Sequence, residues 1–142
     1  MLRLNRVLCG LLLACLVAGC GSSDSGVHHL SGKVTFNGQP VPKGRILFLP
    51  NATLGGSGQG CFAEINDGVY DTRASGAPTP EGATTVRIEG FDGKTSASNS
   101  VGKPLFLGYE VKLESLRAGV TQDFDVPAAA AKTLPKAGEE AP

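Results

Sequence analysis

The amino-acid sequence predicts an all-β protein with the architecture of an antiparallel β-sandwich. About seven short segments alternate apolar and polar side chains with period two, and each is bounded by Gly, Pro, Asn or Asp. The 142 residues include 20 Gly and 9 Pro without a collagen-like period, which fits many turns between short strands. No segment has a convincing amphipathic-helix period, and the length is typical of a single domain.

Residues 1–19 are predicted to be a signal peptide that precedes the β-domain. Arg3 and Arg6 stand before an uncharged apolar run over residues 7–18. A short positively charged region, an apolar run and a cleavage site with small residues are typical of export signals. A transmembrane helix is the alternative, but a membrane span needs about 20 apolar residues and this run is shorter.

The stretch Val17-Ala18-Gly19-Cys20 resembles a bacterial lipobox. In that family the chain is cut before the cysteine, here between Gly19 and Cys20, and the cysteine then carries two or three acyl chains such as palmitate. The resemblance implies a membrane lipid anchor on Cys20 and a location in the cell envelope, on the periplasmic or outer-membrane face. Several acyl chains give stable anchoring, whereas one would be marginal.

The remaining chain divides into three parts. Residues 20–28 are the lipidated cysteine and a flexible Gly/Ser tether, and residues 29–127 are the β-domain. Residues 128–142 are rich in Ala, Pro, Lys and Glu and are predicted to be a disordered tail, with a short helix over the Ala run as the alternative. Removal of the signal and lipidation of Cys20 would leave Cys61 as the single thiol, so no intrachain disulfide is expected.

Charge limits the classes of partner. The formal net charge is +0, and it becomes −2 without the segment that holds Arg3 and Arg6, because all 13 acidic residues follow that segment. No basic patch for DNA or RNA is present, so no nucleic-acid partner is expected. Membrane contact is expected through the lipid anchor alone.

The predicted strands begin at residues 30–36, where Leu30, Val34 and Phe36 share one face. The pair Asn37-Gly38 marks a turn or short loop, and the sequence "RILFLP" over residues 45–50 is apolar on both faces, as a central strand is.

The later strands follow the same pattern. Residues 61–65 place Cys61 on an inward face, and Asp67-Gly68 predicts a hairpin into the strand at 69–70. Further alternating segments occupy residues 83–91, 105–116 and 121–126, with inward Val86, Ile88, Tyr109, Val111, Leu113, Phe124 and Val126.

Residues 30–127 resemble carboxypeptidase regulatory-like domains. The similar features are Gly32-x-Val34, Asn37-Gly38 with Pro40-Val41, and Gly44 before Ile46 and Phe48, followed by the segments "INDGVYDTR", "GATTVRIEG" and "DFDVP". The resemblance implies a transthyretin-like (prealbumin-like), seven-stranded Greek-key β-sandwich. It concerns turn and core positions, so it implies a fold and no activity. Related hydroxyisourate hydrolases end in Tyr-Arg-Gly-Ser, whereas this chain ends in "EEAP".

Three features of the sequence suggest phosphate binding, metal binding or nucleophilic catalysis, and each has a simpler interpretation. Gly93-Lys94-Thr95 lacks the glycine that a phosphate-binding loop needs five residues earlier, so a polar loop is expected. His28-His29 would point to opposite faces of a strand, which argues against a shared metal. Cys61 shares strand parity with Ala63 and Ile65, which predicts a buried, inert thiol.

Carboxylates form the remaining candidates. Asp123 and Asp125 share an outward face, and other acids stand elsewhere at Asp92, Glu110 and Glu114. A calcium site or acid–base catalysis is the alternative to solvated strand faces. Solvated faces are expected, because a calcium loop of the form D-x-D-x-D-G is absent and charges at a sheet edge also block aggregation. The sequon Asn51-Ala52-Thr53 is not expected to be glycosylated beside a bacterial lipobox. We therefore predict no catalytic residue, no metal ligand and no cofactor.

The sequence accordingly predicts a non-enzymatic binding or structural module that contacts envelope protein or polysaccharide. The glycine-rich loop 55–60 and the loop 93–103 are the places where a ligand would be held, unless both are simple connectors. The alternative is an accessory subunit of an envelope protein complex. A hydrolase is the third hypothesis, disfavoured because no histidine is placed near a nucleophile.

Overall fold

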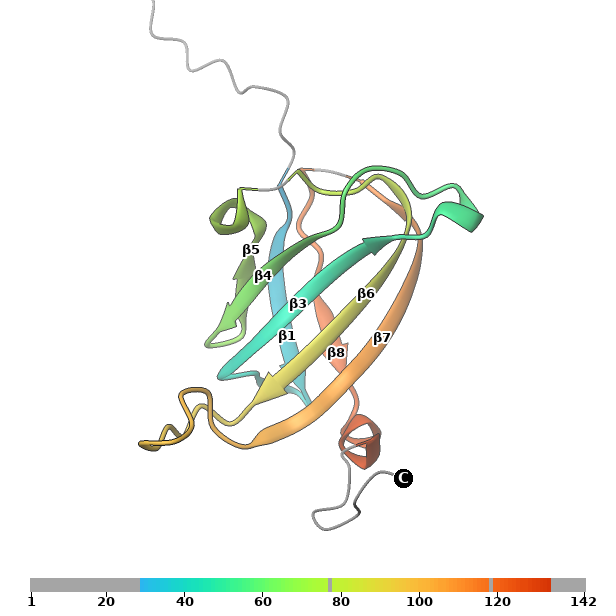
Figure 1. The fold of residues 1–142 in the computed structure, drawn as a ribbon. Helices are drawn as coiled ribbons and strands as arrows, with labels where there is room; N and C mark the ends of the chain where they lie inside the picture. The colour runs from blue at the N-terminus through green and yellow to red at the C-terminus, as the bar shows by residue number, and fades with distance from the viewer. Residues whose placement is uncertain (1–28, 77, 118, 134–142) are drawn as a thin grey trace, which may run out of the picture.

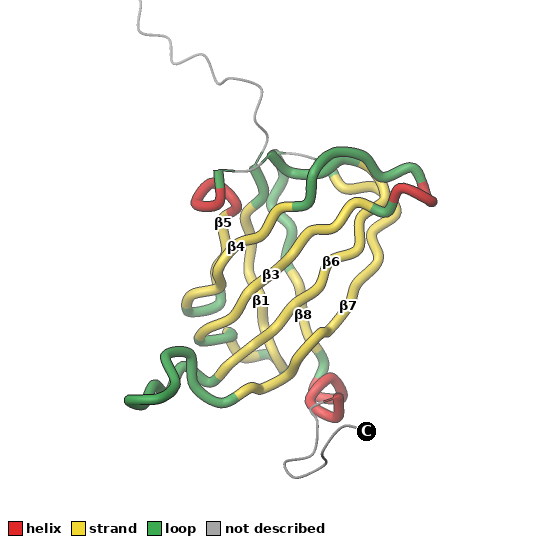
Figure 2. Tube along the Cα trace, viewed as in Figure 1, coloured by secondary structure: helices red, strands yellow, loops and turns green. Residues whose placement is uncertain are grey.

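The computed structural model describes residues 29–133 except 77 and 118, and it confirms an all-β protein. Its strands are β1 (Ser31–Phe36), β2 (Gln39–Pro40), β3 (Lys43–Pro50), β4 (Cys61–Asn66), β5 (Val69–Asp71), β6 (Gly82–Phe91), β7 (Pro104–Leu116) and β8 (Phe124–Val126). In the described residues, helix is limited to short 3₁₀ segments, η1 (Ala52–Leu54), η2 (Thr72–Ser75) and η3 (Ala128–Thr133), which Figure 2 shows as isolated turns between and after the strands.

The strands form one curled sheet in the order β2-β1-β5-β4-β3-β6-β7, with β8 on the far side of β1. Figure 1 shows β1 and β8 behind β3, β6 and β7, so the sheet curls back over its own inner face. All adjacent strands are antiparallel except β1 and β8, which pair in parallel. The predicted central strand is indeed central, because β3 lies between β4 and β6.

Two tight turns set the local register. Asp67 and Gly68 both have positive φ, 49° and 77°, and Asn66 pairs with Val69 across them, which confirms the predicted hairpin. Asn37 and Gly38 have φ of 50° and 74° and form a second hairpin, so the two residues Gln39–Pro40 make a short strand beside β1. Both turns have the geometry that suits the twist of paired strands.

The core lies inside the curl. Ile46 and Phe48 of β3 face it together with Val86 and Ile88 of β6, and all four are fully buried. Val34 of β1 joins the same cluster from the opposite wall. The inward parities predicted for Val34, Val86 and Ile88 are therefore confirmed. Strand β3 was predicted to be apolar on both faces, but Leu49 on its outer face is 40% exposed. Apolar burial on one face leaves the other face of β3, β4 and β6 to solvent.

Helix η3 follows β8 and packs against β7. Ala130 is only 8% exposed and belongs to the core cluster, so the alanine run adds a packed helical turn to the domain at residues 128–133. Within the predicted tail of 128–142, these first six residues are thus helical, and the rest lies outside the described residues. The signal peptide, Gly19, Cys20 and the tether also lie outside them. Among the described residues, no helix is long and apolar enough to cross a membrane.

Candidate functional site

The outer face of β3, β4 and β6 carries paired charges at one end of the sheet. Arg45 of β3 stands opposite Glu64 of β4, and their side chains form an ion pair at 3.0 Å. Lys43, two residues earlier on the same face, donates a hydrogen bond from Nζ to Oδ1 of Asn66. On the other side of β3, Glu89 of β6 stands opposite Arg45.

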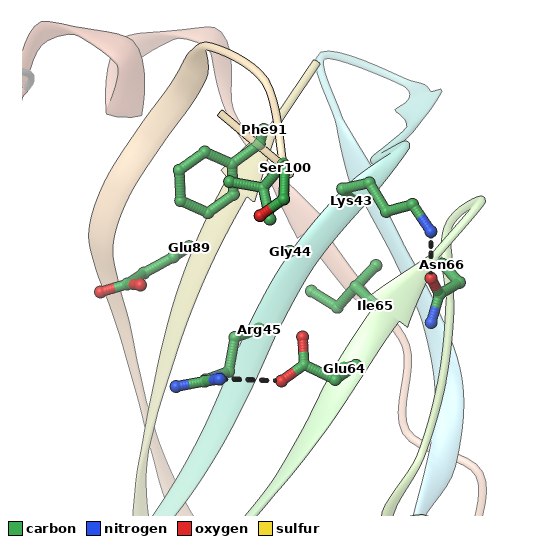
Figure 3. Close-up of a pocket in the computed structure, with 10 residues that line it drawn as sticks. Lys43, Gly44, Arg45, Glu64, Ile65, Asn66, Glu89, Phe91 and Ser100 are labelled. Carbon is green, nitrogen blue, oxygen red and sulfur yellow. Dashed lines mark hydrogen bonds and ion pairs between the residues drawn. The ribbon is translucent and has the colours of Figure 1, made fainter. Parts of the chain in front are cut away.

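These residues surround a hollow of about 440 Å³ (Figure 3). Its lining is Lys43, Gly44, Arg45, Glu64, Ile65, Asn66, Glu89, Phe91, Ser100 and Val101. Figure 3 shows the Arg45–Glu64 pair at one end, the Lys43–Asn66 pair on one side, and Phe91 with Ser100 at the other end. We call this hollow the outer-face pocket.

Gly44 is required in this pocket by close strand packing. A Cβ at position 44 would collide with the backbone oxygen of Glu89 on the neighbouring strand. The absence of a side chain lets β3 and β6 approach each other at the pocket.

The loop after β6 builds one wall of the pocket. Asp92 Oδ1 accepts hydrogen bonds from the backbone N–H groups of Lys94 and Lys103, and Asn99 Oδ1 accepts from those of Val101 and Gly102. The hydrogen bond from the N–H of Lys94 is the main reason why the pKa of the Asp92 carboxyl lies below its ordinary value. The hydrogen bond from the N–H of Lys103 lowers this pKa as well. These bonds organise the loop that carries Ser100 and Val101.

The pocket combines hydrogen-bond donors, acceptors and one aromatic ring. Lys43 and Arg45 donate, Glu64 and Glu89 accept, and Asn66 and Ser100 can do both. The half-buried ring of Phe91 supplies an apolar surface at the same place. Such a set can hold an uncharged polyhydroxylated molecule, because each hydroxyl both donates and accepts.

A second, smaller hollow of about 280 Å³ lies beside the Asn37-Gly38 turn. Its lining is mainly apolar and comprises Phe36, Asn37, Gln39, Pro40, Pro42, Asp92 and Leu105. It offers few polar groups that could orient a ligand.

The thiol of Cys61 is buried, as its strand parity predicts. Cys61 is 5% exposed, and burial raises the pKa of its thiol to about 11. A thiol with a raised pKa is a poor nucleophile at neutral pH, so Cys61 belongs to the core.

The predicted carboxylate candidates are not gathered into one site. Asp123 accepts a hydrogen bond from the backbone N–H of Lys33 at 2.7 Å, and Asp125 accepts one from the Thr35 hydroxyl at 2.6 Å. Both acids therefore tie the β8 segment to β1. Glu110 pairs with Arg87 at 2.6 Å on β7 and β6. In the described part of the chain, no three His, Cys, Asp or Glu side chains lie close enough to hold a metal ion.

The remaining motifs have local structural roles. Gly93-Lys94-Thr95 lies in the loop after β6, where no helix follows. Asn51 precedes η1 and accepts a hydrogen bond from the Thr53 hydroxyl within its own sequon. His28 lies outside the described residues, and the backbone oxygen of His29 accepts from Gly119.

The two loops expected to hold a ligand lie at opposite ends of the sheet (Figure 1). Only loop 93–103 contributes to the outer-face pocket, through Ser100 and Val101. Loop 55–60 is fastened elsewhere, since Ser57 and Glu81 exchange backbone hydrogen bonds of 2.9 and 3.1 Å. The strand residues that line the pocket were not among the sequence candidates. Strand parity places Glu64 and Glu89 outward, but no local pattern shows which outward side chains meet across neighbouring strands.

Comparisons with known proteins give no relative for this chain: no protein-family model, no curated protein and no solved structure matches it.

Proposed function

We propose that this protein is a lipid-anchored envelope protein whose β-domain binds polysaccharide through the outer-face pocket, without catalysing a reaction. Cys20 is the proposed anchor, after cleavage behind Gly19. The domain is proposed to be a carboxypeptidase regulatory-like, transthyretin-like Greek-key β-sandwich, in which the β1–β8 wall is one layer and β3, β6 and β7 belong to the other.

The single observation that carries the binding proposal is the composition of the outer-face pocket. The Phe91 ring stands with Ser100 and two pre-formed polar pairs around a hollow of about 440 Å³. The pairs are Lys43–Asn66 and Arg45–Glu64. That volume is within the range of small-ligand sites, roughly 300–1,000 Å³. An aromatic surface with convergent donors and acceptors suits a sugar ring, which has apolar C–H faces and hydroxyl edges.

Binding is favoured over hydrolysis because the pocket is open to water. Arg45 and Glu64 are 53% and 55% exposed, and the carboxylate already accepts from the guanidinium. Acid–base catalysis works best in a site that excludes water and aligns a proton donor with the reacting bond. The Arg45–Glu64 pair is better suited to hydrogen bonding with hydroxyl groups.

Co-sedimentation with insoluble peptidoglycan, together with titration of chitotetraose, tests this function. We expect wild-type protein to bind at least one of these probes. Phe91→Ala removes the ring, and Ser100→Ala removes one hydroxyl, so each should weaken that binding, the former by about tenfold or more. The matched control is Thr85→Ala, which lies on the same face of β6 about 20 Å along the strand from Phe91.

Two outcomes overturn this assignment. One is a Phe91→Ala variant that folds and binds as tightly as the wild type. The other is a wild-type protein that binds neither probe. Thermal unfolding of each variant separates loss of binding from loss of fold.

The anchor is tested separately. Cys20→Ser should abolish labelling by radioactive palmitate and release the protein from the membrane fraction. The lipoprotein assignment would be rejected if the variant stayed in the membrane fraction and the parent took up no label. The assignment of the outer-face pocket would not be affected by that result.

An accessory subunit of an envelope complex is the second candidate, and one observation favours it. Phe62 and Leu49 are 44% and 40% exposed on the outer face, and Leu47 lies between them, directly opposite Phe62. A protein partner could cover this apolar strip. In-cell crosslinking from Leu49 would recover one stoichiometric protein in that case.

A further inference from the structure

Strand β7 (Pro104–Leu116) ends the curled sheet. It pairs along one edge with β6, and no strand of the described chain pairs with its other edge. An edge strand of 13 residues is long, and an exposed edge presents backbone N–H and C=O groups that another strand can bind.

The side chains of β7 differ between the two faces of the strand, apolar on one and charged on the other. Tyr109, Val111 and Leu113 point toward the inner face and are only partly buried, although they pack against the core. Glu110, Lys112 and Glu114 point outward and are exposed. The edge therefore combines an incompletely covered apolar row with a row of alternating charge.

We propose that β7 is a dimerisation edge, where the β7 strands of two copies of this chain pair antiparallel about a twofold axis at Val111. In this register Val111 stands opposite Val111 of the second copy, and Tyr109 stands opposite Leu113. Glu110, which also pairs with Arg87 of its own chain, stands opposite Lys112 of the second copy, and the symmetry repeats this contact. The pairing matches apolar residues with apolar residues and opposite charges with each other.

Neighbouring registers are worse for identifiable reasons. An axis at Glu110 or at Lys112 places like charges directly opposite one another. An axis between two residues would bring the inner face of one strand onto the outer face of the other, because side chains alternate with period two. An axis at Leu113 pairs Lys112 with Glu114 but sets Val111 against Ser115, so it covers less apolar surface.

Three features limit the length of the pairing. At one end, Gly82 pairs with Leu116 and Thr84 pairs with Leu113, so Glu114 and Ser115 together oppose Ala83 in a bulge. Ile88 pairs with Tyr109 and Gly90 pairs with Phe106, so Leu107 and Gly108 together oppose Glu89 in a bulge, with Gly108 at φ 64°. Bulges end or bend a ladder. Helix η3 also packs against β7. The new ladder therefore spans about residues 108–114, which corresponds to a small interface of modest affinity. This inference does not rest on the proposed binding function.

Cysteine crosslinking of the full-length chain tests the register. Val111→Cys would place two thiols across the axis, where paired Cα atoms are about 4.5–5.5 Å apart and a disulfide can form. Leu113→Cys is the matched control on the same face. Its two copies would be about 14 Å apart along the strands. Under mild oxidation we expect disulfide dimers for Val111→Cys at several times the level of Leu113→Cys and of the unsubstituted parent.

Charge exchange tests the same contact without cysteines. Glu110→Lys and Lys112→Glu each create like-charge pairs across the axis, so each should raise the dimer dissociation constant about tenfold in sedimentation analysis. The double exchange restores opposite charges and should restore dimerisation. Equal crosslinking of both cysteine variants, a monomeric wild type at millimolar concentration, or a double exchange that stays dissociated would each overturn the proposal. Circular dichroism confirms that the variants remain folded.

Discussion

Asp92 Oδ1 accepts a hydrogen bond of 2.8 Å from the backbone N–H of Lys103, eleven residues further along the chain. The same oxygen accepts from the N–H of Lys94 at 3.0 Å, so one carboxylate closes the whole loop between β6 and β7. Because this loop carries Ser100 and Val101 into the outer-face pocket, the shape of the pocket depends on Asp92.

Replacing the carboxylate should loosen the loop and leave the sheet intact. In Asp92→Ala, the N–H groups of Lys94 and Lys103 lose their acceptor, so their hydrogen-exchange protection should fall at least tenfold. Protection of β3 and β6 should not change. Thr95→Ala, an exposed change in the same loop, is the control. Unchanged protection in Asp92→Ala would mean that the backbone alone holds the loop.

The loop should also respond to acid. The pKa of Asp92 is lowered from its ordinary value of 3.8, chiefly by the Lys94 N–H. A lowered pKa means that the carboxylate stabilises the folded loop fully above pH 3.8, and that this contribution is lost as the pH falls through the lower, folded value. The amide chemical shifts of Lys94 and Lys103 should be constant from pH 7 to 4 and move only below that range. A transition centred above pH 4 would contradict this assignment.

Alkaline pH should destabilise the core. Burial raises the pKa of Cys61 from 9.0 to about 11, and burial also raises that of Tyr70, helped by the charges of Asp123 and Cys61. A raised pKa gives stability that is complete below the unfolded value and is lost as the pH rises toward the folded one. The free energy of unfolding in urea should therefore fall between pH 9 and 11. Cys61→Ala should show a shallower fall, and an equal fall would assign the effect to Tyr70.

Gly44→Ala should lower the free energy of unfolding by about 1–3 kcal/mol, the usual cost of overpacking. The added methyl would collide with the backbone oxygen of Glu89, which a change of rotamer cannot relieve. Thr85→Ala, on the outer face of β6, should change stability by less than about 0.5 kcal/mol. Chemical denaturation measures both, and a neutral Gly44→Ala would mean that β3 and β6 can separate without cost.

A buried hydroxyl should also matter for stability. Thr72 is 0% exposed, and its Oγ1 accepts a hydrogen bond from the backbone N–H of Leu30 at 2.9 Å. Thr72→Val keeps the shape but leaves that N–H without its acceptor, which should cost about 1–3 kcal/mol. Thr35→Val removes a hydrogen bond that is exposed to water and should cost less. Equal unfolding midpoints for the two variants would contradict the role given to Thr72.

Local signals along the chain were sufficient for most of the strands. Alternation with period two placed Val86 and Ile88 on inward faces, and Asp67-Gly68 marked its hairpin. Residues 45–50 were predicted to be apolar on both faces, and only the structure shows that Ile46 and Phe48 are the inward pair. The two-residue strand β2 was not predicted, because two residues are too few to show an alternating pattern. Only their pairing with β1 makes them a strand. The parallel pairing of β8 with β1 also has no local signal, since it joins segments 90 residues apart.

The sequence by itself determined most of the strands, many of the side chains that face inward and that Cys61 is a core thiol, because these properties depend on alternation over a few neighbouring residues. Only the tertiary structure decided which outward residues meet. Register and strand order bring Arg45 to Glu64 and set Glu89 opposite Arg45, while Asp92 folds the following loop over the same face. The pocket draws on three strands and a loop, and their alignment is set by long-range backbone pairing that no local pattern encodes.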